Sequence, residues 1–196
     1  MNENICNPVK SRALILIDDS NLYYGFRKCG WKFDYIKFYD WLVKQFDPIG
    51  IYFFGGIISK KTFFDKHPTH TISGFVKAKN DREHFFKKLK TKGYIVKTKP
   101  VTSVYDYTKG GFNRKCNFDV EITIIALDKL SDYQELVLCS GDGDFIKLIK
   151  YAKGKFRKTT VMAHKHRLNS ELEITANKTI FFETLKPELE KKKGLP

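Results

Sequence analysis

The sequence predicts an α/β fold in which helices cover both faces of a mainly parallel β-sheet. Two observations lead to this prediction. Short apolar runs that are typical of buried strands alternate along the chain with segments of helical periodicity. The length of 196 residues is enough for one domain with a substantial core but is short for two. We therefore expect a single α/β domain.

The first half of the chain begins with a buried strand, predicted by the apolar run ALILI. A polar stretch at 59–79 is expected to be a long connection between elements. Gly93 is expected to end the helix that follows this stretch. In order, the predicted elements are a strand at 13–17, helices at 20–29 and 33–46, a strand at 50–58, a helix at 81–93 and a strand at 94–101.

The second half of the chain repeats this alternation after a connecting segment. Residues 103–117 contain the adjacent Gly110 and Gly111 together with several basic residues, so an exposed loop is expected. The predicted elements that follow are a helix at 118–130, a strand at 135–140, a helix at 144–154, a strand at 158–163, a helix at 170–177 and a strand at 178–185.

Positive charge is the most informative part of the composition. Thirty-six Lys and Arg residues against 22 Asp and Glu residues give a formal net charge of +14. Residues 145–170 contain no acidic residue at all. A field of this kind attracts polyanions such as nucleic acid, so we expect an anionic polymer as the partner. A basic surface that merely keeps the protein soluble is the alternative.

The cysteines and the hydropathy pattern predict a cytoplasmic protein. The four cysteines form no CxxC pair, which favours reduced thiols over a zinc ribbon or a redox dithiol. No apolar run is long enough to span a bilayer, so no membrane contact is expected. The first ten residues lack the apolar core of a signal peptide.

Acidic residues follow two of the predicted strands at the point where each strand ends. Asp18 and Asp19 come directly after the first strand, and Asp142 and Asp144 lie in the turn SGDGDF after the strand at 135–140. Chemistry in open parallel sheets gathers beyond the carboxyl ends of the strands, where the crossover direction switches. If these two strands are neighbours, their carboxylates converge, and Asp119 at the start of its helix completes the cluster.

Converging carboxylates repel one another, and a cation resolves this conflict. Mg²⁺ or Mn²⁺ prefers oxygen ligands and can stabilise charge on a phosphodiester, so an acidic metal site with basic walls suits a nuclease. Glu121 is a candidate outer member of the cluster. Helix capping is the simpler interpretation of each acidic residue taken singly, with Asp19 or Ser20 capping one helix and Asp144 another.

The order of these motifs resembles the NYN domain, a branch of the PIN-like nucleases. The resemblance spans residues 13–184 and rests on four motifs, namely Asp-x-Ser-Asn at 18–21, Lys-x-Asn-x-Asp-Val-Glu at 115–121, Ala-Leu-Asp at 126–128 and Ser-Gly-Asp-Gly-Asp-Phe at 140–145. It departs from the family pattern where Asp19 stands in place of a frequent Gly and where Asn177 follows Ala176 in place of Asp. The roles of Asp19 and Asp128 are left open.

The resemblance implies a three-layer α/β/α sandwich and metal-dependent hydrolysis of RNA. Residues 13–185 would form the NYN domain, between an N-terminal extension at 1–12 and a basic C-terminal tail at 186–196. The acidic positions of the family fall on residues that would hold Mg²⁺ or Mn²⁺, namely Asp18, Asp119, Asp142 and Asp144. Asn21 matches the Asn after the first Asp and would orient a water or a ligand, so it is included among the catalytic candidates.

Basic and aromatic residues are the candidates for contact with nucleic acid. Aromatic rings can stack on unpaired bases, and we expect such contacts from the segment 105–112 rather than from Tyr23 or Tyr24. The contact candidates are Tyr107, Lys109, Arg114, Lys115 and Lys147. Single-stranded or structured RNA is the expected partner, while DNA as a substrate and homo-oligomerisation are left open.

The histidines are not expected to bind a metal. The pairs His67–His70 and His164–His166 have no Cys or further His at a recognisable ligand spacing, so exposed loop positions are expected for them.

The leading hypothesis is a metal-dependent ribonuclease. Receiver, haloacid-dehalogenase-like and glycosyltransferase domains also use aspartates, but a complete motif for the first two is missing and the Asp-x-Asp match to the third is short. The alternative from a different class is an RNA-binding adaptor that keeps the fold without cleaving RNA.

Overall fold

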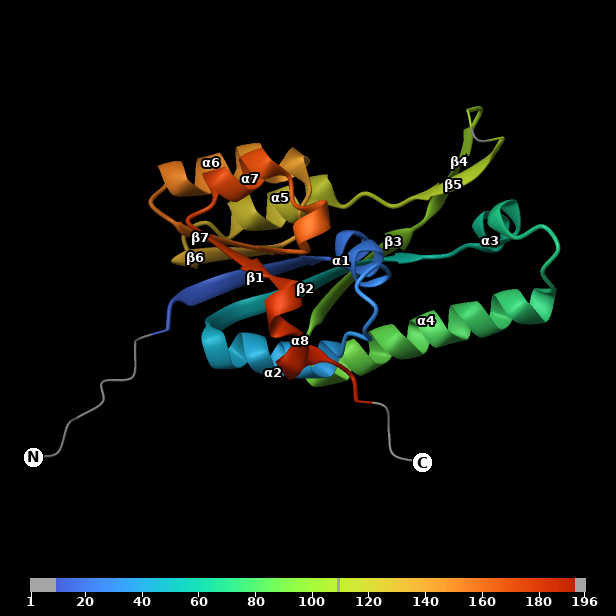
Figure 1. Ribbon diagram of the computed structural model, residues 1–196, viewed down its shortest axis with the longest axis horizontal. Coiled ribbons are helices and arrows are strands. Elements are labelled where there is room, and N and C mark those ends of the chain that lie inside the picture. Colours follow the sequence, from blue (N-terminus) through green and yellow to red (C-terminus); the bar gives the residue numbers. More distant parts are fainter. Residues whose placement is uncertain (1–9, 109, 193–196) are drawn as a thin grey trace, which may run out of the picture.

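Six parallel strands form the central sheet of the protein (Figure 1). The computed structural model describes residues 10–108 and 110–192. The strand order is β3-β2-β1-β6-β7-β8, and every neighbouring pair is parallel. These strands are β1 (Arg12–Asp18), β2 (Asp47–Ile57), β3 (Ile95–Pro100), β6 (Glu135–Cys139), β7 (Lys158–Ala163) and β8 (Lys178–Phe181).

Helices cover both faces of this sheet, which confirms the predicted three-layer α/β/α sandwich. One face carries α2 (Tyr35–Gln45), α4 (Ile72–Lys92) and α8 (Lys186–Leu189), and the other carries α5 (Asp119–Asp128), α6 (Ile146–Gly154) and α7 (Ser170–Thr175) (Figure 1). The remaining elements are the helices α1 (Asp19–Phe26) and α3 (Lys60–Lys66) and the 3₁₀ turns η1 (Gly143–Phe145), η2 (Lys165–Arg167) and η3 (Phe182–Leu185).

The central strand β1 contributes to both hydrophobic cores, because successive side chains of a strand point to opposite faces. Ala13, Ile15 and Ile17 pack into the core shared with α2, α4 and α8. Leu14 and Leu16 pack into the core shared with α5, α6 and α7. All five side chains are fully buried, so the position of the strand end at Asp18 is fixed from both faces.

The expected connection at 59–79 is wrong, since most of this stretch is helical. It contains α3 and the first two turns of α4, and each helix begins at a hydroxyl cap that the sequence offers. The Ser59 hydroxyl accepts a hydrogen bond from the Thr62 amide at 3.1 Å, and the Thr71 hydroxyl accepts one from the Gly74 amide at 3.2 Å. The end of α4 at Gly93 is as expected, and this glycine adopts φ +122°.

The expected loop at 103–117 is also wrong in part. It contains most of a β-hairpin formed by β4 (Thr102–Asp106) and β5 (Gly111–Lys115), which pair in antiparallel fashion. Cross-strand contact between Tyr105 and Phe112, whose ring centroids are 5.1 Å apart, helps to hold the two strands together. The hairpin projects beyond the sheet at the end where α3 lies (Figure 1).

The two ends of the chain extend the domain slightly beyond the expected limits. Residues 1–9 of the expected N-terminal extension lie outside the described residues, and the Lys10 ammonium group donates to the Val43 carbonyl at 2.9 Å. The last predicted strand ends earlier, at Phe181, and continues as η3 and α8. Leu189 of α8, in the segment interpreted as a tail, is fully buried in a hydrophobic core. Within the described residues, no helix is both long and apolar enough to cross a membrane.

Candidate functional site

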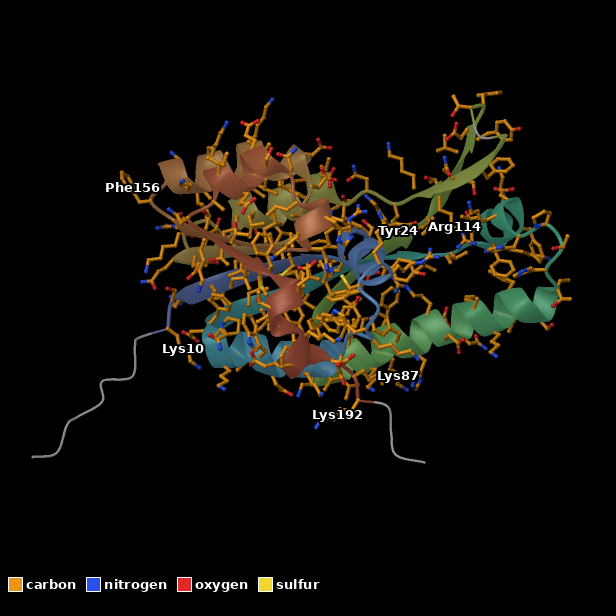
Figure 2. The ribbon with its side chains drawn as sticks, in the orientation of Figure 1. Lys10, Tyr24, Lys87, Arg114, Phe156 and Lys192 are labelled. Carbon is orange, nitrogen blue, oxygen red and sulfur yellow. The ribbon has the colours of Figure 1, made fainter. Side chains whose placement is uncertain are left out.

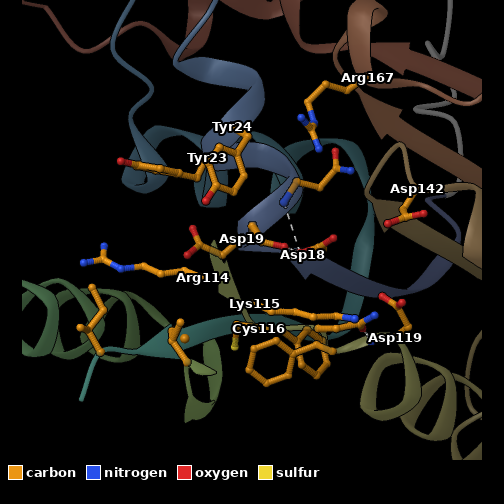
Figure 3. Close-up of a pocket in the computed structure, with 18 of the residues that line it drawn as sticks. Asp18, Asp19, Tyr23, Tyr24, Arg114, Lys115, Cys116, Asp119, Asp142 and Arg167 are labelled. Atoms are coloured by element: carbon orange, nitrogen blue, oxygen red, sulfur yellow. Dashed lines mark hydrogen bonds between the residues drawn. The ribbon is translucent and has the colours of Figure 1, made fainter. Parts of the chain in front are cut away.

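The switch point of the sheet lies between β1 and β6. From β1 the chain moves to β2 on one side, whereas from β6 it moves to β7 on the other. A cavity of about 450 Å³ opens at the carboxyl ends of these strands. Figure 3 shows this cavity with carboxylates on its walls, and its lining includes Asp18, Asp19, Asn21, Asp119 and Asp142. We refer to it as the acidic pocket.

Asp18 is the most tightly held carboxylate of the acidic pocket. Its Oδ1 accepts hydrogen bonds from the Ser20 amide at 3.1 Å, the Ser20 hydroxyl at 2.7 Å and the Asn21 amide at 3.3 Å. Its Oδ2 accepts a hydrogen bond from the Ser140 hydroxyl at 3.1 Å, which joins the ends of β1 and β6. Burial nevertheless raises the pKa of Asp18, and these hydrogen bonds only partly oppose the shift.

Helix capping at the first helix therefore belongs to Asp18 and not to the expected Asp19 or Ser20. Asp18 caps α1 and lines the acidic pocket at the same time. The two interpretations that the sequence offers, helix cap and site residue, describe one side chain.

The loop after β6 is fixed to α1 by two polar contacts. The Gly141 amide donates to Asn21 Oδ1 at 3.1 Å, and the Asp142 amide donates to the Ser140 hydroxyl at 3.3 Å. The loop also leaves no space at Gly141, where an added Cβ would lie 2.5 Å from the Arg167 carbonyl oxygen. Only glycine fits this approach of two backbones.

Asp142 and Asp144 have different environments. Asp142 lines the acidic pocket, and its Oδ1 accepts a hydrogen bond from the Asp144 amide at 3.1 Å, so Asp142 caps η1. The expected capping role of Asp144 is thus filled by Asp142. Asp144 is exposed and is not among the residues that line the pocket.

Asp119 faces the acidic pocket from the first turn of α5, and its backbone amide donates to Asn117 Oδ1 at 2.7 Å. Burial raises the pKa of Asp119, and the negative charges of Asp142 and Asp144 raise it further. The three carboxylates are therefore close enough to repel one another. Glu121 lies apart from them, because it forms an ion pair with Lys99 at 2.6 Å.

Asp19 is paired with a cation already present in the protein. It forms an ion pair with Arg82 of α4 and accepts a hydrogen bond from the Tyr35 hydroxyl at 3.4 Å. The Arg82 Nε also donates to the Gly56 carbonyl at 3.2 Å, which fixes the guanidinium group. Asp19 is therefore an internal salt-bridge partner on the wall of the pocket.

The comparison with protein families follows this geometry closely. The model of the NYN domain family matches residues 12–185, from the first residue of β1 to the end of η3. The chain belongs to the NYN domain family. The motifs quoted for the resemblance lie within this match, and those at 18–21, 115–121 and 140–145 contribute residues to the acidic pocket of this NYN domain.

Two relatives extend the comparison. The low amplitude and bright protein LabA of Synechococcus elongatus is 27% identical over 184 residues, which cover 92% of this chain and 89% of LabA. A crystal structure of a protein of unknown function from Vibrio parahaemolyticus superposes with a TM-score of 0.65 at 22% identity. The superposition covers 90% of this chain and 96% of that one, so the two proteins share the fold.

Basic side chains also line the acidic pocket of this NYN domain. The expected contact residues Arg114 and Lys115 are among them, together with Arg82 and Arg167, which the sequence did not single out. Arg167 points into the pocket from η2, whereas the Arg114 side chain points away from Asp119 and Asp142 (Figure 3). The Arg114 Nε and Nη2 are buried and have no hydrogen-bond partner among the described residues.

The aromatic residues at the acidic pocket are not the ones expected. Tyr23 and Tyr24 of α1 are 52% and 45% exposed and line the pocket, although the sequence favoured the segment 105–112. Figure 2 shows Tyr24 near Arg114 at this edge of the sheet. Tyr107 is 89% exposed on the hairpin, and Lys147 is exposed on α6, but neither lines the pocket. The expected contact Lys109 lies outside the described residues.

Proposed function

We propose that this NYN domain is a metal-dependent ribonuclease. The observation that carries the proposal is the meeting of Asp18, Asp119 and Asp142, from three separate segments, in one pocket with basic and aromatic walls. Membership of a PIN-like nuclease family supports the same activity. We further propose that the protein works in the cytoplasm, since Cys29, Cys116 and Cys139 are free thiols.

The donor set of the acidic pocket fits a hard divalent cation. All the candidate ligands are carboxylate oxygens, which Mg²⁺ and Mn²⁺ prefer. Burial and mutual repulsion raise the pKa of Asp18 and Asp119, so both carboxylates carry their charge at a cost that a cation would offset. Asp18, Asp119 and Asp142 would hold the ion, and Asp144 would add negative charge beside them. When bound, the ion would activate a water and stabilise charge on the phosphodiester.

The remaining residues of the acidic pocket would position the substrate. The Oδ1 atom of Asn21 is already used by the Gly141 amide, so its side-chain nitrogen is the group that can donate to a water or a phosphate oxygen. Arg167 and Lys115 would bind the RNA backbone, because both carry permanent positive charge at the pocket. Tyr23 and Tyr24 would stack on unpaired bases, which favours single-stranded RNA.

A cleavage assay with the full chain and its Asp142→Asn variant tests the proposal. The variant keeps an oxygen that can cap η1 but removes one negative charge, so it should fold normally and cleave RNA at least ~100-fold more slowly. Asp128→Asn, an exposed change at the far end of α5, is the matched control and should cleave like the wild type. Both are assayed on single-stranded RNA, structured RNA and DNA, with Mg²⁺, Mn²⁺ or chelator. Equal cleavage by all three proteins would point to a contaminating nuclease and refute the assignment.

RNA binding without cleavage is the second candidate function. The β4–β5 hairpin favours it, because Tyr105 and Tyr107 are exposed outside the acidic pocket and would bind RNA independently of any metal. Binding of RNA by the wild type with no cleavage under any metal would support this candidate over the nuclease.

A further inference from the structure

Four side chains with ligand atoms that zinc commonly uses meet beyond the C-terminal end of α1. Cys29 follows α1, His164 follows β7, His166 lies in η2 and Glu183 lies in η3. One ligand atom from each of the four lies within 4.8 Å of all the others. We refer to these residues as the Cys-His cluster, and no member of it lines the acidic pocket.

The spacing of these atoms matches a tetrahedral site. The Cys29 Sγ lies 3.1 Å from His164 Nδ1 and 4.0 Å from Glu183 Oε1. The same Glu183 oxygen lies 3.3 Å from His164 Nδ1 and 4.0 Å from His166 Nδ1. Ligands of a tetrahedral zinc ion with bonds of about 2.0–2.3 Å lie about 3.3–3.7 Å apart, so shifts of a few tenths of an ångström would complete the coordination.

The fold determines which nitrogen of His164 faces the Cys-His cluster. The side chain is fully buried, and its ring packs against Gly25, where an added Cβ would lie 1.9 Å from Cδ2 and 2.7 Å from Nε2. Phe26 packs edge-on against the same ring, with centroids 4.2 Å apart. Nε2 has no hydrogen-bond partner in the described part of the chain, and Nδ1 is presented to Cys29 and Glu183.

The expectation of an exposed loop position is therefore wrong for His164. His166 does remain accessible, with 32% of its side chain exposed, and leaves a path for an ion to enter.

The charges of the cluster select the kind of ion. One thiolate, one carboxylate and two neutral imidazoles carry a formal charge of −2, which neutralises a divalent cation. A thiolate and two imidazoles favour Zn²⁺ over Mg²⁺, which prefers oxygen ligands. We propose that Cys29, His164, His166 and Glu183 form a structural zinc site that joins the C-terminal end of α1 to β7 and η3.

A hydrogen-bonded cluster without metal is the competing explanation. The Cys29 thiol can donate to the Gly25 carbonyl at 3.4 Å, and the Lys165 amide donates to Glu183 Oε1 at 3.2 Å. This alternative predicts that the purified chain has no affinity for Zn²⁺ beyond that of the acidic pocket.

Cobalt substitution of the full chain separates the two explanations. Co²⁺ bound to a thiolate gives a sulfur-to-metal charge-transfer band, which oxygen ligands of the acidic pocket cannot produce. The wild type should bind one Co²⁺ with this band and with the visible absorption of tetrahedral cobalt, and one equivalent of Zn²⁺ should displace it. Absence of the band at saturating Co²⁺ would overturn the proposal.

Variants assign the ligands. Cys29→Ser should abolish the charge-transfer band, whereas Cys116→Ser, at another half-buried thiol, should retain it. His166→Ala should weaken Zn²⁺ affinity at least tenfold, and its exposed side chain makes loss of folding an unlikely confounder that circular dichroism checks directly. His84→Ala, an exposed histidine of α4, is its matched control. Asp142→Asn should leave Zn²⁺ affinity unchanged, and a loss of affinity there with none in His166→Ala would overturn the assignment.

Thermal unfolding supplies a readout that does not depend on spectroscopy. One equivalent of Zn²⁺ should raise the Tm of the wild type and of Asp142→Asn to the same extent, because binding to the folded state alone stabilises it. The Tm of folded His166→Ala should rise much less. Equal shifts in all three proteins would show that the zinc binds elsewhere and would overturn the proposal.

Discussion

Asn21 Oδ1 accepts a hydrogen bond from the Gly141 amide at 3.1 Å, although 120 residues separate the two in the chain. Both groups are buried, and the bond fixes the loop that carries Asp142 to the first turn of α1. The shape of the acidic pocket therefore depends on an interaction that is neither a metal contact nor part of the sheet.

Replacing Asn21 with Ala should lower the free energy of unfolding by about 1–3 kcal/mol, because the Gly141 amide would be left buried without its acceptor. Urea denaturation monitored by circular dichroism measures the change. Asn80→Ala, at an exposed position of α4, should alter stability far less. Similar small effects of both substitutions would show that the loop finds another partner.

Gly141→Ala should destabilise the protein by about 1–3 kcal/mol, since its Cβ would lie 2.5 Å from a backbone oxygen that has little freedom to move. Gly154→Ala is the matched control, because no atom lies within 4 Å of the added Cβ and the residue ends α6. Thermal unfolding of the two variants compares them, and an equal Tm would contradict the predicted clash.

Asp119→Asn should remove most of the stabilisation that Mg²⁺ gives the folded protein. At tenfold excess over its Kd, a ligand of the folded state contributes about 1.4 kcal/mol, and we expect this gain for the wild type. With chelator present the variant should be at least as stable as the wild type, because the raised pKa of Asp119 shows that its charge is disfavoured there. Asp128→Asn, on the same helix, should respond to Mg²⁺ as the wild type does, and an equal response of Asp119→Asn would exclude that residue as a ligand.

Tyr133→Phe should reverse its effect on stability between neutral and alkaline pH. Burial raises the pKa of Tyr133 from 10 to about 12. A raised pKa means that the folded state retains the proton longer, so stability is fully present below pH 10 and is lost as the pH rises towards 12.

Below pH 9 the variant should therefore be less stable than the wild type by about 1 kcal/mol, because the hydrogen bond to the Ala126 carbonyl is lost. Above pH 10 the difference should shrink and change sign. Guanidinium denaturation at both values measures it, and a difference that is independent of pH would refute the prediction.

The sheet and its cores could be predicted from the sequence because their strands are short apolar runs between helical segments. The start of α4 could not, since Ile72 and Val76 are 61% and 45% exposed and give this end of the helix no apolar face to recognise. The hairpin was missed for a related reason. Its strands pair only with each other in the described sheets, so their side chains are mixed in polarity and half exposed.

The acidic pocket could be predicted in outline because topology brings the carboxyl ends of β1 and β6 together. The pairing of Asp19 with Arg82 could not, because the two residues lie 63 positions apart on elements whose angle the sequence does not define. The same limit applies to Cys29 and His164, which are 135 positions apart. Ligand spacing along the chain cannot identify a cluster that only the tertiary fold assembles.

The position of β1 between β2 and β6 also sets a time in the life of the protein. During translation the ribosome releases Asp18 early, but its neighbours Ser140 and Asp142 emerge only after more than two thirds of the 196 residues have been made. A nascent chain therefore carries an unfinished edge of β1 and no closed acidic pocket. The messenger RNA that is being read is consequently out of reach of the completed pocket until synthesis of that copy is nearly over.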